Sequence, residues 1–165
     1  MTVVVIIGAP GAGKTRIGRR VAKLLGVPFV DTDKRIVASH GPIAEIFTHY
    51  GEPYFRTVER AAVAAALSED AVVTLGAGAV LDSSTQQALA GHRIMQLSVR
   101  AEAVEKRIAG GKRPLLAGGI AAWQSLVDAR QPIYDRLSHH TIDTSNRSLS
   151  AIAVEIVDWL REGTA

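Results

Sequence analysis

One stretch, Gly8-Ala9-Pro10-Gly11-Ala12-Gly13-Lys14-Thr15, constrains the fold of this chain more than any other. It fits the pattern G-x-x-x-x-G-K-[ST] at every fixed position. It also follows a short apolar run and precedes a segment with helical spacing, which is the context of a phosphate-binding loop. The glycines let backbone N–H groups converge on phosphate oxygens at the positive end of a helix. The motif predicts a P-loop NTPase and leaves the reaction open.

The loop also predicts individual roles. We assign ATP binding to six consecutive residues: Gly11, Ala12, Gly13, Lys14, Thr15 and Arg16. The Lys14 ammonium is expected to reach the β- and γ-phosphates, so we count it among the catalytic residues as well. The Thr15 hydroxyl is expected to ligate Mg²⁺, which we predict as the cofactor.

Short β-branched runs alternate with longer segments of helical periodicity, which favours an α/β fold with a parallel sheet. Five strands are predicted: Val3–Ile7, Pro28–Val30, Ala71–Leu75, Ile94–Ser98 and Thr141–Asp143. The last helix is expected over Leu149–Leu160, behind Ser148 as its N-cap. Because there is neither a repeat nor a linker, we predict a single domain over residues 1–165.

The composition limits the classes of ligand and partner that we expect for this protein. There are 19 Lys and Arg against 16 Asp and Glu, and the small surplus is not gathered in a run, so it favours an anionic small ligand over nucleic acid. The absence of cysteine excludes disulfides and thiolate metal sites. No apolar segment is long and uninterrupted enough for a signal peptide or a membrane span. We expect a cytoplasmic monomer without membrane or nucleic-acid partners.

The carboxylate that often ends the third strand of such folds is missing, since Thr74 runs into a glycine-rich turn. Asp31 and Asp33 are the candidates to replace this missing carboxylate. If Val30-Asp31-Thr32-Asp33 closes the second strand, both side chains point to one side at the edge where ligands bind. We expect Asp31 and Thr74 to serve the metal through water, and Asp33 to accept a hydrogen bond from a substrate hydroxyl. The alternative is that both aspartates are turn formers and helix caps.

Two arginines are candidates for binding an organic carboxylate. Arg56 lies three residues before Glu59, which is expected to orient its planar guanidinium. Arg130 is the second candidate for the same anion. The alternative for Arg56 and Glu59 is a solvated surface pair worth a few tenths of a kcal/mol. A further feature is the segment between Gly110-Gly111 and Gly118-Gly119, where paired glycines suggest hinges around a mobile segment.

Taken in order, these motifs resemble those of the shikimate kinases. The residues that carry the resemblance are the P-loop, Asp31-Thr32-Asp33, Phe55-Arg56 with Glu59, Gly76-Ala77-Gly78-Ala79, Arg113-Pro114-Leu115, and Arg130 with Pro132 and Tyr134. The resemblance runs from about Val3 to Val157. Many NTPases share the P-loop, whereas the combination of the other motifs is far more specific.

The resemblance implies a nucleoside-monophosphate-kinase type of fold, with a five-stranded parallel sheet flanked by helices. It also implies a substrate-binding helical region at about 33–61 and a mobile lid at about 110–119. The implied reaction transfers the γ-phosphoryl group of ATP to the 3-hydroxyl of shikimate, giving shikimate 3-phosphate and ADP. This step belongs to the route to chorismate and the aromatic amino acids.

The resemblance also implies roles for residues. Asp33 would hold the substrate hydroxyls near the attacking oxygen, and Arg113 would reach from the lid to phosphate and substrate, so both join Lys14 as catalytic residues. Acceptor binding would involve Asp33, Arg56, Glu59, Gly76, Ala77, Gly78 and Arg130. On the nucleotide side, Arg107 would stack on adenine, Arg113 would contact phosphate, and Arg147 would lie in the adenine-side loop.

One residue departs from the family pattern, which usually has three successive glycines where this chain has Ala77 in the middle. If the backbone there is left-handed, strain of about 1–2 kcal/mol follows. If a ligand presses on the Cα, affinity falls. If neither holds, the alanine is harmless.

Two other functions remain open. A kinase of another small hydroxylated acid, such as a gluconate kinase, would share the scaffold. An NTP-binding regulator or GTPase-like switch is a different class, but the D-x-x-G and N-K-x-D motifs of a GTPase are absent.

Overall fold

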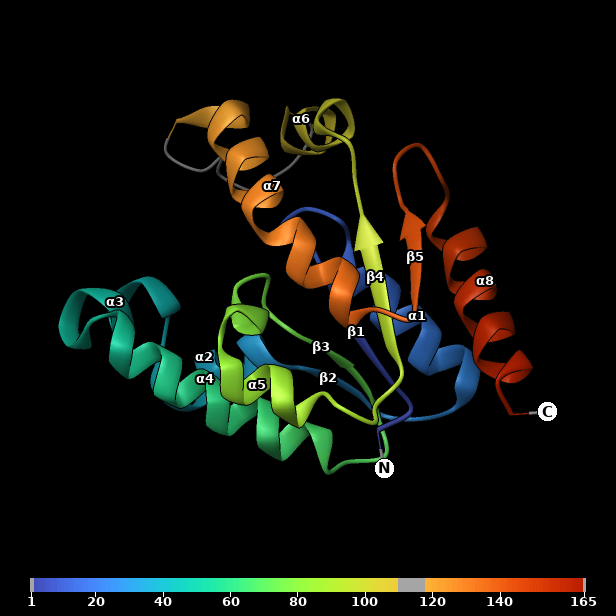
Figure 1. Cartoon of the computed structure of the whole chain (residues 1–165), viewed down its shortest axis with the longest axis horizontal. Helices are drawn as coiled ribbons and strands as arrows, with labels where there is room; N and C mark the ends of the chain where they lie inside the picture. The colour runs from blue at the N-terminus through green and yellow to red at the C-terminus, as the bar shows by residue number, and fades with distance from the viewer. Residues whose placement is uncertain (1, 110–117, 165) are drawn as a thin grey trace.

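Five short strands form a parallel sheet in the order β2-β3-β1-β4-β5 in the computed structural model, which describes residues 2–109 and 118–164 (Figure 1). The strands are β1 Val4–Gly8, β2 Phe29–Asp31, β3 Val72–Thr74, β4 Ile94–Ser98 and β5 His140–Asp143. All four neighbouring pairs are parallel. The predicted fold class is therefore confirmed, and each predicted strand is found within one residue at either end.

Helices connect and cover these strands. Along the chain they are α1 Lys14–Leu25, α2 Thr32–His40, α3 Ile43–Tyr50, α4 Glu52–Leu67, a 3₁₀ turn η1 Ala79–Leu81, α5 Ser83–Ala88, α6 Ala101–Ala109, α7 Gly119–Leu137 and α8 Leu149–Glu162. The Ser148 hydroxyl accepts a hydrogen bond from the Ala151 N–H, so the predicted cap of the last helix is present. None of the described helices is long and apolar enough to cross a bilayer.

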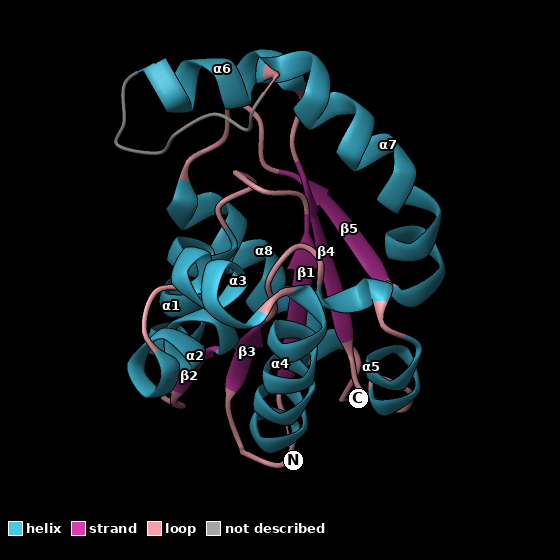
Figure 2. Ribbon diagram, turned by 90° about the vertical axis from the view of Figure 1, so that its left-hand side faces the viewer, coloured by secondary structure: helices cyan, strands magenta, loops and turns pink. Residues whose placement is uncertain are grey.

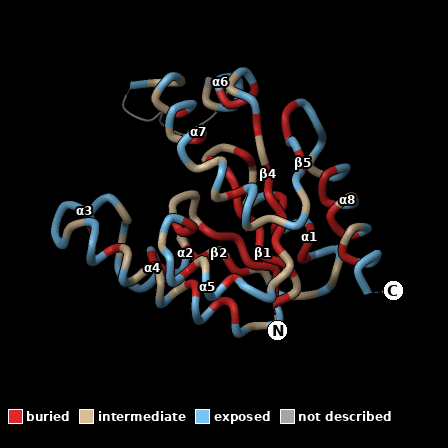
Figure 3. The backbone as a smooth tube through the Cα atoms, viewed as in Figure 1, coloured by how far each residue is buried: buried red, intermediate tan, exposed pale blue. Residues whose placement is uncertain are grey.

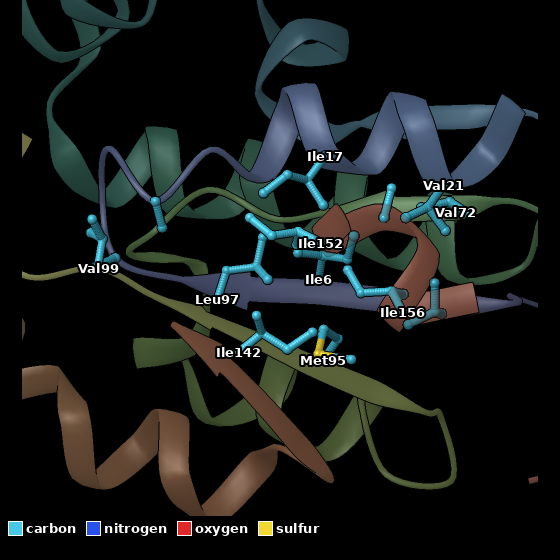
Figure 4. Packing of buried hydrophobic residues seen from close by; sticks show 14 of the residues in the cluster. Ile6, Ile17, Val21, Val72, Met95, Leu97, Val99, Ile142, Ile152 and Ile156 are labelled. Atoms are coloured by element: carbon cyan, nitrogen blue, oxygen red, sulfur yellow. The ribbon is translucent and has the colours of Figure 1, made fainter. Parts of the chain in front are cut away.

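Side chains of β1 alternate between the two faces of the sheet, as the pleat of a strand requires. Val4 and Ile6 belong to the core on the face covered by α1 and α8, where Ile17 and Ile152 meet them (Figure 4). Val5 and Ile7 belong to the core on the opposite face, under α4 and α5. The buried strands in the middle of the molecule result from this double coverage (Figure 3).

The helices α2 and α3 and the first turns of α4 extend beyond the sheet and hold a small core of their own (Figure 1). Ile36, Ile46 and Phe55 are buried together in it, one from each helix. This region coincides with the segment at about 33–61 that the sequence predicts to bind the acceptor. Its role stays a prediction, as does that of the lid at about 110–119, of which only Gly118 and Gly119 lie among the described residues.

The prediction that Asp31 and Asp33 share one side of an extended strand was wrong. Strand β2 ends at Asp31, whose side chain accepts a hydrogen bond from the Lys34 N–H and caps α2. Asp33 therefore lies in the first helical turn. The helix turns the chain at the end of β2, and both carboxylates still line one cavity.

The strand order explains why the cavity lies where it does. Strand β1 is central, the chain moves outward from it to β2 and back to β3, and then crosses to β4 on the other side. Ligands of open α/β sheets bind outside the carboxyl ends of strands at such a switch point. The loops after β1, β2 and β3 meet there.

Candidate active site

The phosphate loop leads from β1 into α1 through a left-handed residue. Gly13 has φ 91° and ψ 21°. This left-handed conformation is strained for a residue with a Cβ, so glycine fits the position. The Lys14 ammonium donates hydrogen bonds to the carbonyl oxygens of Gly8 and Ala9, at 2.8 and 3.0 Å. The lysine is thus held over the loop, where the motif predicts it.

Three side chains from outside the loop hold its remaining carbonyl groups. The Trp123 indole N–H of α7 donates to the Pro10 oxygen at 2.8 Å, and the Arg107 guanidinium of α6 donates to the Gly11 oxygen at 2.7 Å. The Thr144 hydroxyl, which follows β5, donates to the Ala12 oxygen at 2.8 Å. In a trans peptide the C=O and N–H point in opposite directions. Fixing the Pro10 and Ala12 carbonyls on the outside therefore turns the Gly11 and Gly13 N–H groups inward, whereas the Ala12 N–H donates to the Ala9 oxygen within the loop at 3.2 Å.

A cavity of about 300 Å³ adjoins the loop. Its walls are Pro10, Gly11 and Gly13–Thr15 of the phosphate loop, the two carboxylates of Asp31 and Asp33, and the segment from Thr74 to Ala77. Figure 2 shows α6 above the carboxyl ends of the strands and α7 running from that end down along the side of the sheet. A phosphate-binding loop and two carboxylates thus share one space.

The predicted metal ligands are close together. The Thr15 hydroxyl lies 2.8 Å from a carboxylate oxygen of Asp31. Thr74 pairs with Asp31 across the sheet and is only 2 % exposed, and its hydroxyl has no hydrogen-bond partner within the described part of the chain. No group of three His, Cys, Asp or Glu side chains suited to a metal exists among the described residues. One hydroxyl, one carboxylate and a spare hydroxyl fit Mg²⁺, which keeps several waters, better than a metal that needs a full protein cage.

Asp33 lies against the glycine turn. A Cβ added at Gly76 would sit 2.7 Å from its carboxylate, so only glycine leaves room for this approach. Burial raises the pKa of Asp33, and the nearby charge of Asp31 raises it further, while Lys14 and Arg56 act in the opposite direction. Asp33 is therefore a carboxylate placed between two cations and held in a poorly solvated position.

Arg56 is oriented by a buried partner, as predicted. Its guanidinium donates to Glu59 at 2.7 Å, and the Glu59 side chain is only 4 % exposed. Burial raises the pKa of Glu59, and the hydrogen bond and charge of Arg56 partly offset that rise. Glu52, the second acidic neighbour of Arg56, is 63 % exposed and lies 3.5 Å away. The interpretation of the Arg56–Glu59 pair as a merely solvated one does not fit this burial.

Arg130 approaches the same point from α7. A Cβ added at Gly78 would lie 3.1 Å from the Arg56 guanidinium and 3.5 Å from that of Arg130. Two cations from helices far apart in the chain thus converge on one glycine. The space that they share is suited to a carboxylate, which planar guanidinium groups bind through paired hydrogen bonds.

The turn itself is tied to α7. The Tyr134 hydroxyl donates to the Ala77 carbonyl oxygen at 2.7 Å, and Tyr134 is 1 % exposed. Burial raises the pKa of Tyr134, and the charge of Arg130 and its hydrogen bond to the hydroxyl partly offset that rise. Ala77 does not have a positive φ, since Asn146 is the single non-glycine residue with one among those described. Of the outcomes open for Ala77, left-handed strain is excluded.

A second cavity, of about 500 Å³, lies on the far side of the phosphate loop. Its cationic lining comes from Arg16, Arg107 and Arg147, and its apolar lining from Ile17, Val104, Ile108, Leu149 and Ile152. Arg147 is paired with Glu155 at 2.6 Å, and Arg107 also donates to the Thr144 carbonyl. The three arginines predicted for the nucleotide are thus brought together beside an apolar surface fit for a base. The other predicted nucleotide residue, Arg113, lies outside the described residues.

Comparison with known proteins decides the family. A family model described as shikimate kinase matches residues 10–161. The chain belongs to the shikimate kinase family. It is 48 % identical over 162 residues to the shikimate kinase of Salinispora tropica, covering 96 % of this chain and 97 % of that protein. It is 45 % identical to the shikimate kinase of Mycobacterium avium, covering 94 % of this chain and 92 % of that protein.

Solved structures agree with this assignment. The shikimate kinase of Acinetobacter baumannii, solved in complex with shikimate, has a TM-score of 0.88 at 30 % identity, covering 97 % of this chain and 93 % of that one. A gluconokinase of Sinorhizobium meliloti has a TM-score of 0.57 at 16 % identity, covering 96 % of this chain and 91 % of that one, which is a likeness of fold alone. The predictions of a shikimate kinase family member and of an ATP-dependent kinase are confirmed.

Sequence reasoning missed part of this shikimate kinase site. It assigned no role to Trp123, to Thr144 or to the Tyr134 hydroxyl. Trp123, Arg130 and Tyr134 are spaced by seven and four residues, which places them on one face of a helix. That spacing is a signal in the sequence, but it does not say which loop carbonyls the helix will meet.

Proposed function

We propose that this protein transfers the γ-phosphoryl group of ATP to the 3-hydroxyl of shikimate, giving shikimate 3-phosphate and ADP. The observation that carries the proposal is the single cavity in which the phosphate loop and Asp33 face each other, with the point of convergence of Arg56 and Arg130 beside it. A donor phosphate, an acceptor hydroxyl and an acceptor carboxylate each find a matching group there. Membership of the shikimate kinase family supports the choice of acceptor.

Phosphoryl transfer asks a protein mainly for alignment and charge neutralisation. In the proposed mechanism the inward N–H groups of Gly11 and Gly13 and the Lys14 ammonium bind the β- and γ-phosphates. Asp33 accepts a hydrogen bond from the 3-hydroxyl and directs its oxygen at the γ-phosphorus. Arg56 and Arg130 hold the carboxylate of the acceptor, while the N–H groups of Gly76, Ala77 and Gly78 face its ring substituents. Arg113 is proposed to reach phosphate and substrate from the lid.

Mg²⁺ is proposed to be held by the Thr15 hydroxyl directly, and by Asp31 and Thr74 through water. It would supply charge neutralisation on the phosphate oxygens. The 2.8 Å contact between Thr15 and Asp31 and the unpartnered Thr74 hydroxyl support this assignment. Arg16, Arg107 and Arg147 are proposed to border the adenosine moiety, because they line the second cavity beside an apolar surface.

We further propose that the enzyme works as a cytoplasmic monomer, with residues 33–61 as the acceptor-binding region and 110–119 as the lid of one domain. The cytoplasm supplies the ATP that the reaction consumes. Light scattering after size exclusion, with and without substrates, tests the oligomeric state.

An acceptor panel tests the reaction. Purified protein with MgATP is offered shikimate, gluconate and nucleoside monophosphates, ADP release is coupled to NADH oxidation, and the product is identified by ³¹P NMR. We expect turnover with shikimate and formation of shikimate 3-phosphate. Turnover with gluconate alone would replace the proposal with a gluconate kinase, and acceptor-independent hydrolysis would favour an ATP-responsive regulator.

A further inference from the structure

Helix α7 presents one face to both substrate loops. Trp123 and Tyr134 are eleven residues apart, close to three full turns, so their side chains leave the helix within about 20° of each other. About 16 Å of helix separates them along the axis. Trp123 is 3 % exposed and packs in the core under α1 and α8, while Tyr134 is 1 % exposed and packs in the core under α4 and α5. One helix thus joins the two halves of the molecule.

Each of these two side chains ends in one hydrogen-bond donor, and each donor meets a carbonyl of a substrate loop. The Trp123 indole N–H binds the Pro10 oxygen at 2.8 Å in the phosphate loop. The Tyr134 hydroxyl binds the Ala77 oxygen at 2.7 Å in the glycine turn. Both contacts are made from the protein interior, since neither side chain is exposed.

Each of these contacts also fixes the direction of the N–H group in the same peptide. No described peptide bond is cis, so the N–H that follows each held carbonyl points the opposite way. These are the N–H groups of Gly11 and Gly78. Neither has a hydrogen-bond acceptor within the described ranges, 2–109 and 118–164. Each is therefore a donor kept available on the ligand side of its loop.

We propose that Trp123 and Tyr134 are positioning residues, through which α7 sets the orientation of one peptide in the nucleotide loop and one in the acceptor turn. Neither side chain touches a substrate. The inference rests on the proposed function, because it takes ATP as the ligand of the first loop and shikimate as that of the second. It adds that the two contacts act on different substrates although they belong to the same helix.

Two variants separate the two contacts. Tyr134→Phe removes only the hydroxyl, and we expect the KM for shikimate to rise about fivefold while the KM for ATP stays within twofold. Trp123→Phe removes the indole N–H, and we expect the opposite split, with a similar rise in the KM for ATP. A merely structural role would lower the melting temperature and the active fraction without moving either KM selectively.

Controls keep the result decisive. Trp159→Phe makes the same chemical change as Trp123→Phe but lies away from both loops, and we expect neither KM to change. Because the smaller phenyl ring of the Trp123→Phe variant could disturb folding, replacing Trp123 with benzothienylalanine keeps the shape of the indole and removes only the N–H. Titration calorimetry with ADP measures the nucleotide contact without any acceptor.

The outcomes are distinct. The inference is supported if Tyr134→Phe raises only the KM for shikimate and Trp123→Phe raises only the KM for ATP. If the wild type turns over shikimate but both KM values rise together, or neither rises, the inference is overturned and the proposed function stands. If the wild type does not use shikimate, the proposed function fails, and the calorimetric effect of the Trp123 variants alone then decides the nucleotide half.

Discussion

The phosphate loop of the proposed donor site is formed by eight consecutive residues, Gly8–Thr15, whereas the proposed acceptor site takes its groups from four separate segments. Asp33 comes from α2, Arg56 from α4, Gly76–Gly78 from the turn after β3, and Arg130 from α7. The contacts on the acceptor side are long-range in sequence, so they exist only once the sheet and its helices have packed. A local motif therefore predicts the proposed donor site, and the tertiary fold is needed to bring the proposed acceptor site together.

The strongest test of this difference is Asp33→Asn. Asparagine has nearly the same shape but removes the charge and the full acceptor capacity of the carboxylate, so we expect kcat to fall about 1,000-fold. Nucleotide binding depends on the phosphate loop and is expected to stay within twofold. Stopped-time product assays and ADP calorimetry measure the two quantities. Retained turnover, or an equal loss of nucleotide binding, would contradict the assignment of Asp33 to the acceptor side alone.

A smaller effect is expected from Glu59→Gln, which weakens the support of Arg56 without removing the arginine. Glu59 is buried at 2.7 Å from the guanidinium, and the remaining acidic neighbour, Glu52, is largely exposed. We expect the KM for shikimate to rise about tenfold, as for loss of one charge-assisted hydrogen bond, with little change in the KM for ATP. Glu52→Gln is the matched control, because it removes the exposed partner of the same arginine. Equal effects of the two variants would show that burial of Glu59 does not matter.

Stability against pH offers a third comparison, because Asp33 on the acceptor side has a raised pKa through burial and the charge of Asp31. A carboxyl whose folded pKa exceeds its unfolded value of about 3.9 binds more protons when folded. Its contribution to the free energy of unfolding therefore falls as pH rises between the two values. We expect Asp33→Asn to melt at a higher temperature than the wild type at pH 8, and to lose that advantage below about pH 4.

Differential scanning calorimetry from pH 4 to pH 8 measures this difference. Asp128→Asn, in an exposed helical position, is the control for a simple loss of one negative charge. An advantage of Asp33→Asn that grows toward acid pH would mean that the Asp33 carboxylate is stabilised in the folded protein, contrary to its burial. In that case burial of Asp33 could not explain both the loss of turnover and the gain in stability of the Asp33→Asn variant.

The difference between a local motif and contacts made only in the tertiary fold also explains which features could be predicted from the sequence. The strands, the phosphate loop and the Ser148 cap depend on patterns of a few neighbouring residues, and the structure has all three. The extended geometry proposed for Asp31 and Asp33 was wrong because α2 begins one residue after β2 ends. The cavity shared by the two carboxylates was nevertheless anticipated, since the end of a parallel strand fixes the edge at which they lie. The contacts of Trp123, Tyr134 and Thr144 with loop carbonyls join residues 57 to 132 positions apart, and no local pattern encodes such a pairing.

The smallest effect is expected from Ala77→Gly, which restores the glycine usual at this place in the turn. Ala77 has no positive φ, so glycine relieves no left-handed strain. Its carbonyl remains available to Tyr134, so the KM for shikimate should stay within twofold of the wild type. The greater freedom of a glycine in the unfolded chain should lower the free energy of unfolding by about 0.4–1 kcal/mol, measured by urea denaturation. Gly78→Ala is the contrasting variant, because its new Cβ would lie 3.1 Å from the Arg56 guanidinium and should raise the KM for shikimate severalfold. A marked gain in shikimate affinity for Ala77→Gly would instead mean that the Ala77 methyl group presses on the bound acceptor, which is the one unfavourable role left open for this residue.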